Sequence, residues 1–480
     1  MTWSVEISNF LGGFSPAYYK ETYPSFGNRN QAGVMTNIDL TNAGFLTQGP
    51  GLANLTNGTQ AAAITTLIKG ATDFAVTSDV AYGVGGAKLY KFSSTAVTNA
   101  GDWPHTIDKG AVTGEDGEDV AYYQGNLYYS YNHSGSAGDI GKFDLTSTFD
   151  DDWGSTVPTG GAALTNNPHP MVVGGNDVLY VANGRLVTSY DGTTFISSAL
   201  DLPQNAIIQS MEWMSDRLWI AANRPNLSGS NKVTSSIFIW DGTSDSWEAE
   251  IKLMGNVGGT HIKNGVMFIF YRDVSNSGGY KLGYLSGGAV TDLANFTGGL
   301  PAFYQITDYK DFILWNSNGD LFAFGSGDKE LPVRLFQFAD AGYSTVGTLV
   351  TPFGTPIVAS NDGGSNYRLA QFSGYDTNSS WKSLMFDILG SKKNGRIEKV
   401  RINFEQLAAN ARVDWKLLDN QGRTIYSDVV SHTKLGAVTT AYYQLNGKMA
   451  ENFRVELDFA SGNATNPVKI KNVKVYGQSD

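Results

Sequence analysis

The sequence contains no cysteine, which excludes a disulfide framework, a thiolate metal site and cysteine-based catalysis. Charged residues are also scarce, at 16% of the 480 residues. No apolar run reaches the roughly 18 residues of a membrane-spanning helix, so we expect no membrane insertion. The first residues do not form a basic segment followed by an apolar one. They therefore predict synthesis in a cytoplasm without export.

Histidine is rare and helical periodicity is almost absent. The five histidines are His105, His133, His169, His261 and His432, and no two have the spacing of a metal-binding motif. We interpret each as a surface or turn residue. No phosphate-binding loop and no nucleophile-elbow motif occurs. The sequence thus predicts no catalytic residue, no cofactor and no metal site.

Two acidic clusters, Glu115–Asp119 and Asp150–Asp152, come nearest to a metal-binding motif. Both lack the alternating carboxylates and the glycine of a calcium-binding loop, and we interpret them as solvated loops. Two Asp-Gly-Thr segments, at Asp191 and Asp241, partly match the turns of sialidase-like propellers. We interpret them as turns between strands. Two opposed carboxylates on different blades, as glycoside hydrolysis requires, remain an open alternative.

Glycine, serine, threonine, asparagine and aromatic residues dominate, as in turn-rich β proteins. Short β-branched and aromatic runs occur in pairs, and the second run of each pair ends in an aromatic residue. These residues are Phe92, Phe143, Tyr190, Trp240, Tyr284, Phe324 and Phe372. The steps between them are 51, 47, 50, 44, 40 and 48 residues, close to the period of propeller blades.

This repeat predicts an all-β protein with a β-propeller of four-stranded blades over residues 61–380. Seven blades fit best, with six as the alternative. Six apolar residues are expected to be buried between blades: Leu89, Val178, Leu218, Phe268, Ile313 and Ile357. Because a closed ring must join its first and last blades, we expect Ala61–Ile68 to pair in the sheet that contains Tyr367–Phe372.

The two ends of the chain do not follow the repeat. Residues 1–60 are rich in Gly, Asn, Tyr and Pro and are predicted to form an extended N-terminal arm. In residues 381–480, apolar and polar residues alternate, for example over Ile397–Phe404 and Phe453–Phe459. Such alternation indicates strands with one face in a core, so we expect a small antiparallel C-terminal β-sandwich.

The net charge of −11 is unevenly distributed. Residues 1–379 contain 19 Lys and Arg against 35 Asp and Glu, whereas residues 380–480 contain 15 against 10. The main body therefore carries −16 and the C-terminal part +5. An acidic surface repels phosphate, so we expect no direct nucleic acid binding by the main body. The basic part has the charge needed to dock on an acidic protein surface, or it is simply a solvated face.

Two segments resemble virion proteins of tailed bacteriophages. One is Asn37–Gly51, an extended lead-in to the repeats that ends in Pro-Gly. The other is Ser383–Asp387, followed by Lys392-Lys393 and Ile397–Ile402. The resemblance implies a non-enzymatic virion structural protein, associated with the tail, present in several symmetric copies and bound to other virion proteins. A glycan-binding or glycan-cleaving propeller for host receptor recognition is the alternative.

Within this hypothesis the N-terminal arm carries the assembly contacts, because it has apolar residues that no repeat would bury. These residues are Trp3, Phe10, Phe14, Tyr18, Tyr19, Tyr23 and Phe26. Deleting residues 1–30 is then expected to leave a folded propeller that no longer joins its partners.

Overall fold

A computed structural model of the chain describes most of its residues, in segments that cover both ends and the repeats. The described residues are 2–8, 10, 20–21, 32–36, 38–39, 45–60, 66–68, 80–110, 114–224, 234–273, 279–286, 288–325, 333–337, 345–361, 367–376, 379–387, 395–459 and 467–479. Within these segments, no helix has the length and apolar character needed to cross a membrane.

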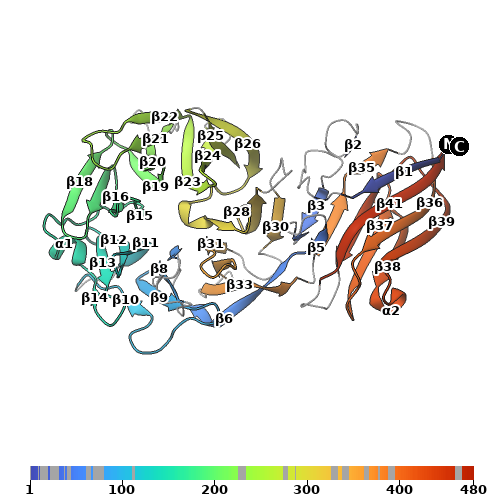
Figure 1. The fold of residues 1–480 in the computed structure, drawn as a ribbon, viewed down its shortest axis with the longest axis horizontal. Coiled ribbons are helices and arrows are strands. Elements are labelled where there is room, and N and C mark those ends of the chain that lie inside the picture. Colours follow the sequence, from blue (N-terminus) through green and yellow to red (C-terminus); the bar gives the residue numbers. More distant parts are fainter. Residues whose placement is uncertain are drawn as a thin grey trace.

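The described residues form seven four-stranded antiparallel sheets, arranged around a central axis (Figure 1). These seven sheets are the blades, numbered here in chain order. Blade one consists of β7 (Thr66–Ile68), β8 (Ala81–Gly85), β9 (Lys88–Phe92) and β10 (His105–Thr106), and blade two of β11 (Glu115–Tyr123), β12 (Asn126–His133), β13 (Asp139–Phe143) and β14 (Phe149–Asp150). Blade three consists of β15 (Met171–Val173), β16 (Leu179–Asn183), β17 (Leu186–Tyr190) and β18 (Phe195–Asp201). Blade four consists of β19 (Ile207–Met214), β20 (Arg217–Arg224), β21 (Thr234–Trp240) and β22 (Ala249–Leu253).

Blades five to seven continue the pattern, and short helical turns join some strands. Blade five consists of β23 (Gly255–Lys263), β24 (Val266–Asp273), β25 (Gly279–Ser286) and β26 (Ala289–Thr297). Blade six consists of β27 (Ile306–Tyr309), β28 (Phe312–Ser317), β29 (Asp320–Phe324) and β30 (Val333–Gln337). Blade seven consists of β31 (Thr345–Val350), β32 (Ile357–Asn361), β33 (Tyr367–Tyr375) and β6 (Pro50–Gln60). Helix α1 (Trp153–Thr156) lies between blades two and three, and the 3₁₀ helix η3 (Phe303–Gln305) precedes β27.

The first strand of each blade lies innermost. Strands β7, β11, β15, β19, β23, β27 and β31 contact one another in sequence, and β31 contacts β7 to complete the circle. The ring is therefore closed. The prediction of a seven-bladed propeller followed by an antiparallel sandwich is confirmed.

As predicted, a strand from the N-terminal part of the chain closes the ring by pairing in the last blade. The strand that does so is β6, not the predicted 61–68. β6 pairs with β33, so that Leu52 lies opposite Phe372 and Gln60 opposite Tyr367. The expected partner, 61–68, instead contributes β7 to blade one. Gly and Asn in Pro50–Gln60 concealed this strand, because both residues are poor strand formers. They fit here because β6 is irregular, with breaks in its register and a positive φ at Asn57.

Apolar side chains fill the spaces between blades. Leu89, Leu218, Ile313 and Ile357 are fully buried, as predicted. Val178 and Phe268 are only partly buried and pack at the margins of their clusters. Both lie at or near the start of a strand, close to the surface turn before it. The prediction that these two residues are buried between blades therefore holds only in part.

The remaining strands form a sandwich of two sheets. Sheet one has the order β39 (Thr440–Ala450), β36 (Gly395–Phe404), β41 (Lys469–Ser479), β5 (Leu46–Gln48), β4 (Ile38–Asp39), with β1 (Thr2–Ile7) also on β41. Sheet two has the order β2 (Lys20–Glu21), β35 (Met385–Asp387), β40 (Asn452–Phe459), β34 (Ser379–Ser383), β3 (Ala32–Thr36), with β37 (Arg412–Leu418) on β40 and β38 (Thr424–Ser431) on β37. Helix α2 (His432–Leu435) connects β38 to β39.

Both chain ends belong to this sandwich. β1 pairs antiparallel with β41 from Thr2–Gln478 to Ile7–Val473, and the two ends lie side by side in Figure 1. The expected boundary at residue 60 is therefore wrong, because β1 to β5 complete the sandwich and β6 completes the propeller. Periodicity cannot reveal strands whose partners lie hundreds of residues away.

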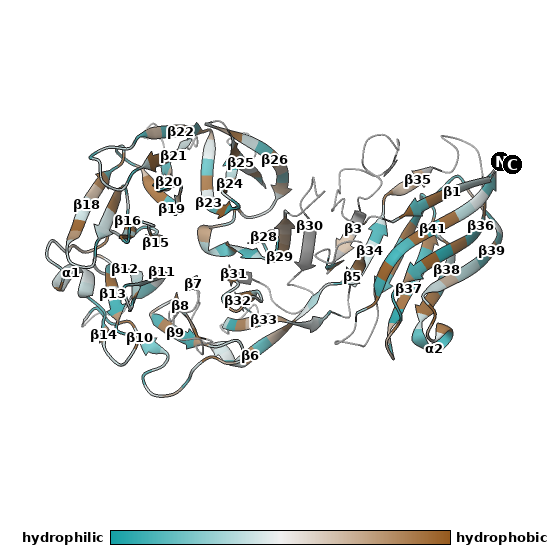
Figure 2. Cartoon of the chain, viewed as in Figure 1, coloured by the Kyte–Doolittle hydropathy of each residue, from teal (hydrophilic) through white to brown (hydrophobic). Residues whose placement is uncertain are grey.

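The sandwich and the propeller share one apolar core. Strands β3 and β4 contact β30 of blade six. A single buried cluster joins sandwich residues such as Trp381 and Ile402 to propeller residues such as Leu314 and Leu349. Figure 2 shows alternating hydrophobic and hydrophilic residues along β36, β39 and β41, which leaves the outer face of sheet one polar.

Candidate functional site in the central channel

The seven innermost strands surround the axis of the ring, and their inner side is called the channel wall below. These strands carry a set of titratable side chains. β11 has an irregularity between Gly117 and Asp119, where its register on β12 shifts. An irregular position of this kind redirects side chains and is frequent beside functional sites. Asp116, Glu118 and Asp119 therefore surround this bulge on the innermost strand of blade two.

Glu118 is held partly away from water. Burial raises the pKa of its carboxyl group to about 7, and the charge of Asp116 adds to the effect. The side-chain amide of Asn132 donates a 2.6 Å hydrogen bond to Glu118 Oε1, which opposes this rise. Burial also raises the pKa of Asp116, against a backbone hydrogen bond from Gly86. Glu118 thus retains a proton close to neutral pH.

Asp119 is buried between blades two and three. Its Oδ2 accepts a 2.7 Å hydrogen bond from the backbone N–H of Met171, and its Oδ1 accepts one of 2.8 Å from Val120. Burial nevertheless raises the pKa of Asp119 to about 8, and the charges of Glu118 and Glu212 contribute to the increase. Asp119 therefore links the two blades and is electrostatically coupled to the channel wall.

A second group extends from blade four to blade six. Burial raises the pKa of Glu212 on β19 to about 7, although the nearby His261 opposes this shift. His261 Nε2 lies 3.1 Å from Asp308 Oδ1, and Lys263 Nζ lies 2.9 Å from the same atom. Glu212 therefore ends an arc of alternating charges on β19, β23 and β27.

Tyr304 approaches the acidic group from η3, ahead of blade six. Burial raises the pKa of its phenol group, and the charges of Glu118 and Asp116 raise it further. Its backbone oxygen accepts a 2.7 Å hydrogen bond from the hydroxyl of Thr348 on β31. Tyr304 is thus a fixed, neutral hydrogen-bond donor beside two carboxyl groups.

A buried hydrogen-bond chain connects Glu118 to the space between blades two and three. His169 Nδ1 lies 2.8 Å from the carbonyl oxygen of Ala182, so this nitrogen carries a proton. Burial lowers the pKa of His169 to about 4, and its Nε2 lies 3.1 Å from the Oδ1 of the Asn132 amide. The N–H₂ group of the same amide donates to Glu118. Asn132 therefore connects the buried ring of His169 to the Glu118 carboxyl group.

This arrangement can bind polar ligands through carboxyl and phenol donors that remain neutral close to pH 7. Groups with raised pKa values on a channel wall are also the groups that acid–base catalysis uses. Within the described parts of the chain, no three His, Asp or Glu side chains are placed to hold a metal ion.

The structure corrects several interpretations from the sequence. Glu115–Asp119 is part of strand β11, so this cluster is not a loop. Asp150 ends β14, and Asp151 and Asp152 lie half-buried in the turn that follows, so the second cluster is a turn but not a solvated one. His133 and His169 are buried, at 3% and 0% exposure. Glu118 and Glu212 were not predicted as site residues. The available signal was a carboxylate on the strand ahead of the paired runs in blades two, four and six.

The Asp-Gly-Thr segments are turns, as interpreted from the sequence. Asp191 Oδ1 accepts hydrogen bonds from the backbone N–H groups of Thr193 and Thr194. Asp241 Oδ1 does the same for Thr243 and Ser244. These hydrogen bonds hold the pKa of both carboxyl groups below the usual range, so both turns carry a negative charge.

The residues predicted for assembly contacts fall into two groups. Phe10 is 1% exposed and meets Trp381 edge to face at 5.3 Å between ring centroids. Trp3 is partly buried and stacks on Phe453. Both pack within the sandwich, so the expectation of a free apolar arm is wrong for them. The other five lie outside the described residues: Phe14, Tyr18, Tyr19, Tyr23 and Phe26.

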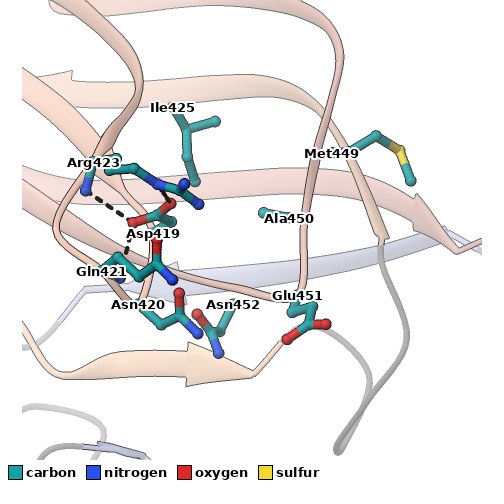
Figure 3. A pocket seen from close by; sticks show the side chains of 9 residues that line it. All are labelled: Asp419, Asn420, Gln421, Arg423, Ile425, Met449, Ala450, Glu451 and Asn452. Carbon is teal, nitrogen blue, oxygen red and sulfur yellow. Dashed lines mark hydrogen bonds and ion pairs between the residues drawn. The ribbon is translucent and has the colours of Figure 1, made fainter.

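A pocket of about 340 Å³ lies at one end of the sandwich, between the β37–β38 turn and the end of β39 (Figure 3). Asp419 is central to it. Its Oδ2 accepts a 2.7 Å hydrogen bond from Arg423 Nε, and its Oδ1 accepts two from backbone N–H groups of the turn. Asp419 is thus occupied in holding its own turn.

No protein-family model matches the chain, and no curated protein matches it. Solved structures with similar folds include an exo-β-1,3-galactanase from Phanerochaete chrysosporium, at 10% identity and TM-score 0.31, over 67% of this chain and 98% of that one. Drosophila Semaphorin 1a is 9% identical with TM-score 0.43, over 67% and 88%. A Bacillus subtilis arabinoxylan arabinofuranohydrolase is 10% identical with TM-score 0.28, over 93% and 96%. Such matches concern the fold alone.

Proposed function

We propose that this protein is a non-enzymatic structural component of a bacteriophage particle, associated with the tail, that acts through protein–protein contacts. Its location would be the virion, after synthesis in the bacterial cytoplasm. Its partners would be other virion proteins and further copies of the chain.

One observation carries the proposal. The two segments that resemble phage virion proteins are more than 300 residues apart in the sequence, yet they meet in one sandwich. Asn37–Gly51 includes β4 and β5, and β5 pairs with β41. β41 also pairs with β36, which contains Ile397–Ile402. Both halves of the resemblance therefore concern the same folded unit and its link to the propeller.

Purified particles from a host that carries this gene provide the test. We expect mass spectrometry to detect the chain at a fixed ratio to the tail proteins, and a deletion of the gene to yield incomplete particles. If the chain is present in the lysate but absent from purified particles, the proposal is wrong.

A glycan-binding or glycan-cleaving propeller is the second candidate, and the channel carboxyl groups favour it. Glu118 and Glu212 come from different blades, and the pKa of each is raised to about 7. Glycoside hydrolysis uses two carboxyl groups, one of them protonated near neutral pH.

This candidate is tested by glycan-array binding and by release of reducing sugar from bacterial surface polysaccharides. If it holds, Glu118→Gln and Glu212→Gln abolish the signal. Glu248→Gln, at an exposed ion pair with Arg217, is the matched control and leaves it unchanged. A wild-type protein without either signal excludes this candidate for the glycans tested.

A further inference from the structure

The outer face of sheet one is a basic surface with aromatic residues between its cations. Two rows of outward-facing residues cross four strands. The first row is Tyr442, Arg401, Lys474 and Glu6, and the second is Gln444, Lys399, Tyr476 and Ser4. The residues between these rows, such as Val400 and Val475, are buried in the sandwich core, which confirms that the rows face outward. This surface is called the basic sheet face below.

The lysine cations of the basic sheet face lie over tyrosine rings. Lys399 Nζ lies 4.7 Å from the ring centroid of Tyr476 and 5.8 Å from that of Tyr442, and Tyr442 is 61% exposed. Lys474 is paired with Glu6 at 3.1 Å. Among the described residues, no acidic group forms an ion pair with Lys399 or Arg401, and the Nε of Arg401, which is buried, has no hydrogen-bond partner. Tyrosine and arginine together are typical of protein interfaces.

A surface of opposite charge lies on the propeller, at the turns of blades two to four. These turns join the first and second strands, or the third and fourth strands, of a blade. Their acidic residues are Asp144, Asp177, Asp191, Asp216, Asp241 and Asp245. This surface is called the acidic turn face below.

Contacts between neighbouring blades bring these turns together. Gln124, in a turn of blade two, donates a 3.0 Å hydrogen bond from Nε2 to Asp177 Oδ2 of blade three. Burial raises the pKa of Tyr123, and the charges of Asp177 and Asp191 raise it further, so both carboxylates lie near one ring. Gly242 of blade four similarly lies against Asn176 and Tyr180 of blade three. The acidic turn face is therefore continuous across three blades.

The two faces cannot meet within one molecule. Blades two to four lie at the end of the molecule opposite the sandwich (Figure 1). We propose that the basic sheet face of one copy docks on the acidic turn face of the propeller of a second copy. The charge balance of −16 in residues 1–379 against +5 in residues 380–480 supports such an attraction.

Such a contact is heterologous, because each copy uses two different surfaces. Heterologous contacts produce closed rings or open filaments according to the rotation between copies, and both arrangements occur in symmetric assemblies. The inference rests on the proposed assembly role, since it names one partner of that role, a second copy of this chain.

Sedimentation of the purified full chain tests the proposal. We expect wild-type protein to self-associate at 50 mM NaCl and its dissociation constant to rise about tenfold or more at 500 mM, because salt screens exposed charges. The double variant Lys399→Glu/Arg401→Glu and the single variant Lys399→Glu are expected to weaken association by about tenfold or more. The single variant removes only an ammonium group that lies on surface rings, so it is expected to fold. Arg412→Glu, on the other sheet and 53% exposed, makes the same charge change and is expected to leave association unaltered.

Variants on the propeller give the second half of the test. The variant Asp216→Lys/Asp245→Lys is expected to be monomeric. Lysine is compatible with the left-handed backbone at Asp216, because Lys310, in the corresponding turn of blade six, has a similar positive φ. When this variant is mixed with Lys399→Glu/Arg401→Glu, each supplies the surface that the other lacks. We therefore expect a 1:1 dimer and nothing larger.

Three results would overturn the proposal. They are a monomeric wild type at its highest soluble concentration, equal association by Lys399→Glu, and a mixture that remains monomeric. Binding of an oligonucleotide by the wild type but not by Lys399→Glu, with no self-association, would identify a nucleic acid as the partner and also overturn it.

Particle composition is measured separately. A chain that is in particles but does not self-associate refutes only this inference, and one that self-associates but is absent from particles refutes only the proposed function.

Discussion

The propeller and the sandwich are both antiparallel, but their paired strands lie at different distances in the sequence. Within a blade, β8 and β9 are separated by two residues, Gly86 and Ala87. In the sandwich, Thr2 pairs with Gln478. Local pairing repeats along the chain and leaves a period, whereas long-range pairing leaves none. Stability that depends on long-range pairs is therefore vulnerable to changes at sites that look unimportant in the sequence.

Removal of residues 1–10 should have the largest effect. It takes away β1 and the buried Ile7 and Phe10, at a cost of about 5–10 kcal/mol, which is comparable to the total stability of a domain. We expect calorimetry to show loss of the sandwich transition. Phe10→Ala should cost about 3–5 kcal/mol, and Phe10→Leu clearly less. A truncated chain that melts like the wild type would show that the N-terminal strands do not support the sandwich.

The β6–β33 ladder is the long-range pairing of the propeller, and Gly58→Ala tests it. A Cβ at this position would lie 2.6 Å from the backbone oxygen of Leu55 and 2.7 Å from that of Leu369. Since neither backbone atom can move freely, we expect a loss of about 1–3 kcal/mol in urea denaturation. Thr59→Ala, exposed in the same strand, is the control. Equal midpoints for both variants would mean that β6 adapts without strain.

The channel should make stability depend on pH. Burial raises the pKa of Glu212 from 4.5 to about 7, so the folded state binds this proton more tightly than the unfolded state does. The resulting stabilisation is complete below about pH 4.5 and is lost as pH rises towards 7. We expect Glu212→Gln to flatten this part of the stability profile and to stabilise the protein at pH 8 by roughly 1–3 kcal/mol. An unchanged profile would show that Glu212 is ionised in the folded protein at acidic pH.

Substitution of turn aspartates should have the smallest effect on stability, and the effect should be equal in the propeller and in the sandwich. Asp241→Ala in blade four and Asp419→Ala in the sandwich each remove a carboxylate that accepts backbone N–H groups of its own turn. Loss of such a cap costs about 1 kcal/mol. Chemical denaturation should give similar losses, because both interactions are local. A much larger loss for Asp419 would mean that its turn also supports the packing of the sandwich.

The same contrast explains what the sequence could predict. The blade period, the seven-fold count and the sandwich strands over Ile397–Phe404 and Phe453–Phe459, which correspond to β36 and β40, follow from patterns within short windows. The sandwich strands β1, β2, β3 and β5 have partners at the far end of the chain, β4 pairs only with β5 among the described strands, and β6 has a composition typical of loops. No window around them contains the information that they are strands.

The channel site was missed for a related reason. Glu118 and Glu212 belong to repeats that are almost 100 residues apart, and only closure of the ring places them on one wall. In the sequence, both glutamates follow residues that are common in strands and turns and that give no sign of a site. The raised pKa values arise from burial by other blades, which no single repeat reveals.

Pairing between β1 and β41 also affects the order of events during protein synthesis. Ribosomes add about 5–20 residues per second, so β1 waits roughly 24–96 seconds for its partner, which lies almost at the end of the chain. During this interval the blades can form one after another, whereas β1, β2, β3 and β5 still lack their C-terminal partners and are accessible to chaperones. A circular permutant that joins residue 479 to residue 2 through a short linker would present β41 and β1 as a hairpin. The sandwich of this permutant should then assemble faster after the chain leaves the ribosome, because β41 and β1 are synthesised one directly after the other.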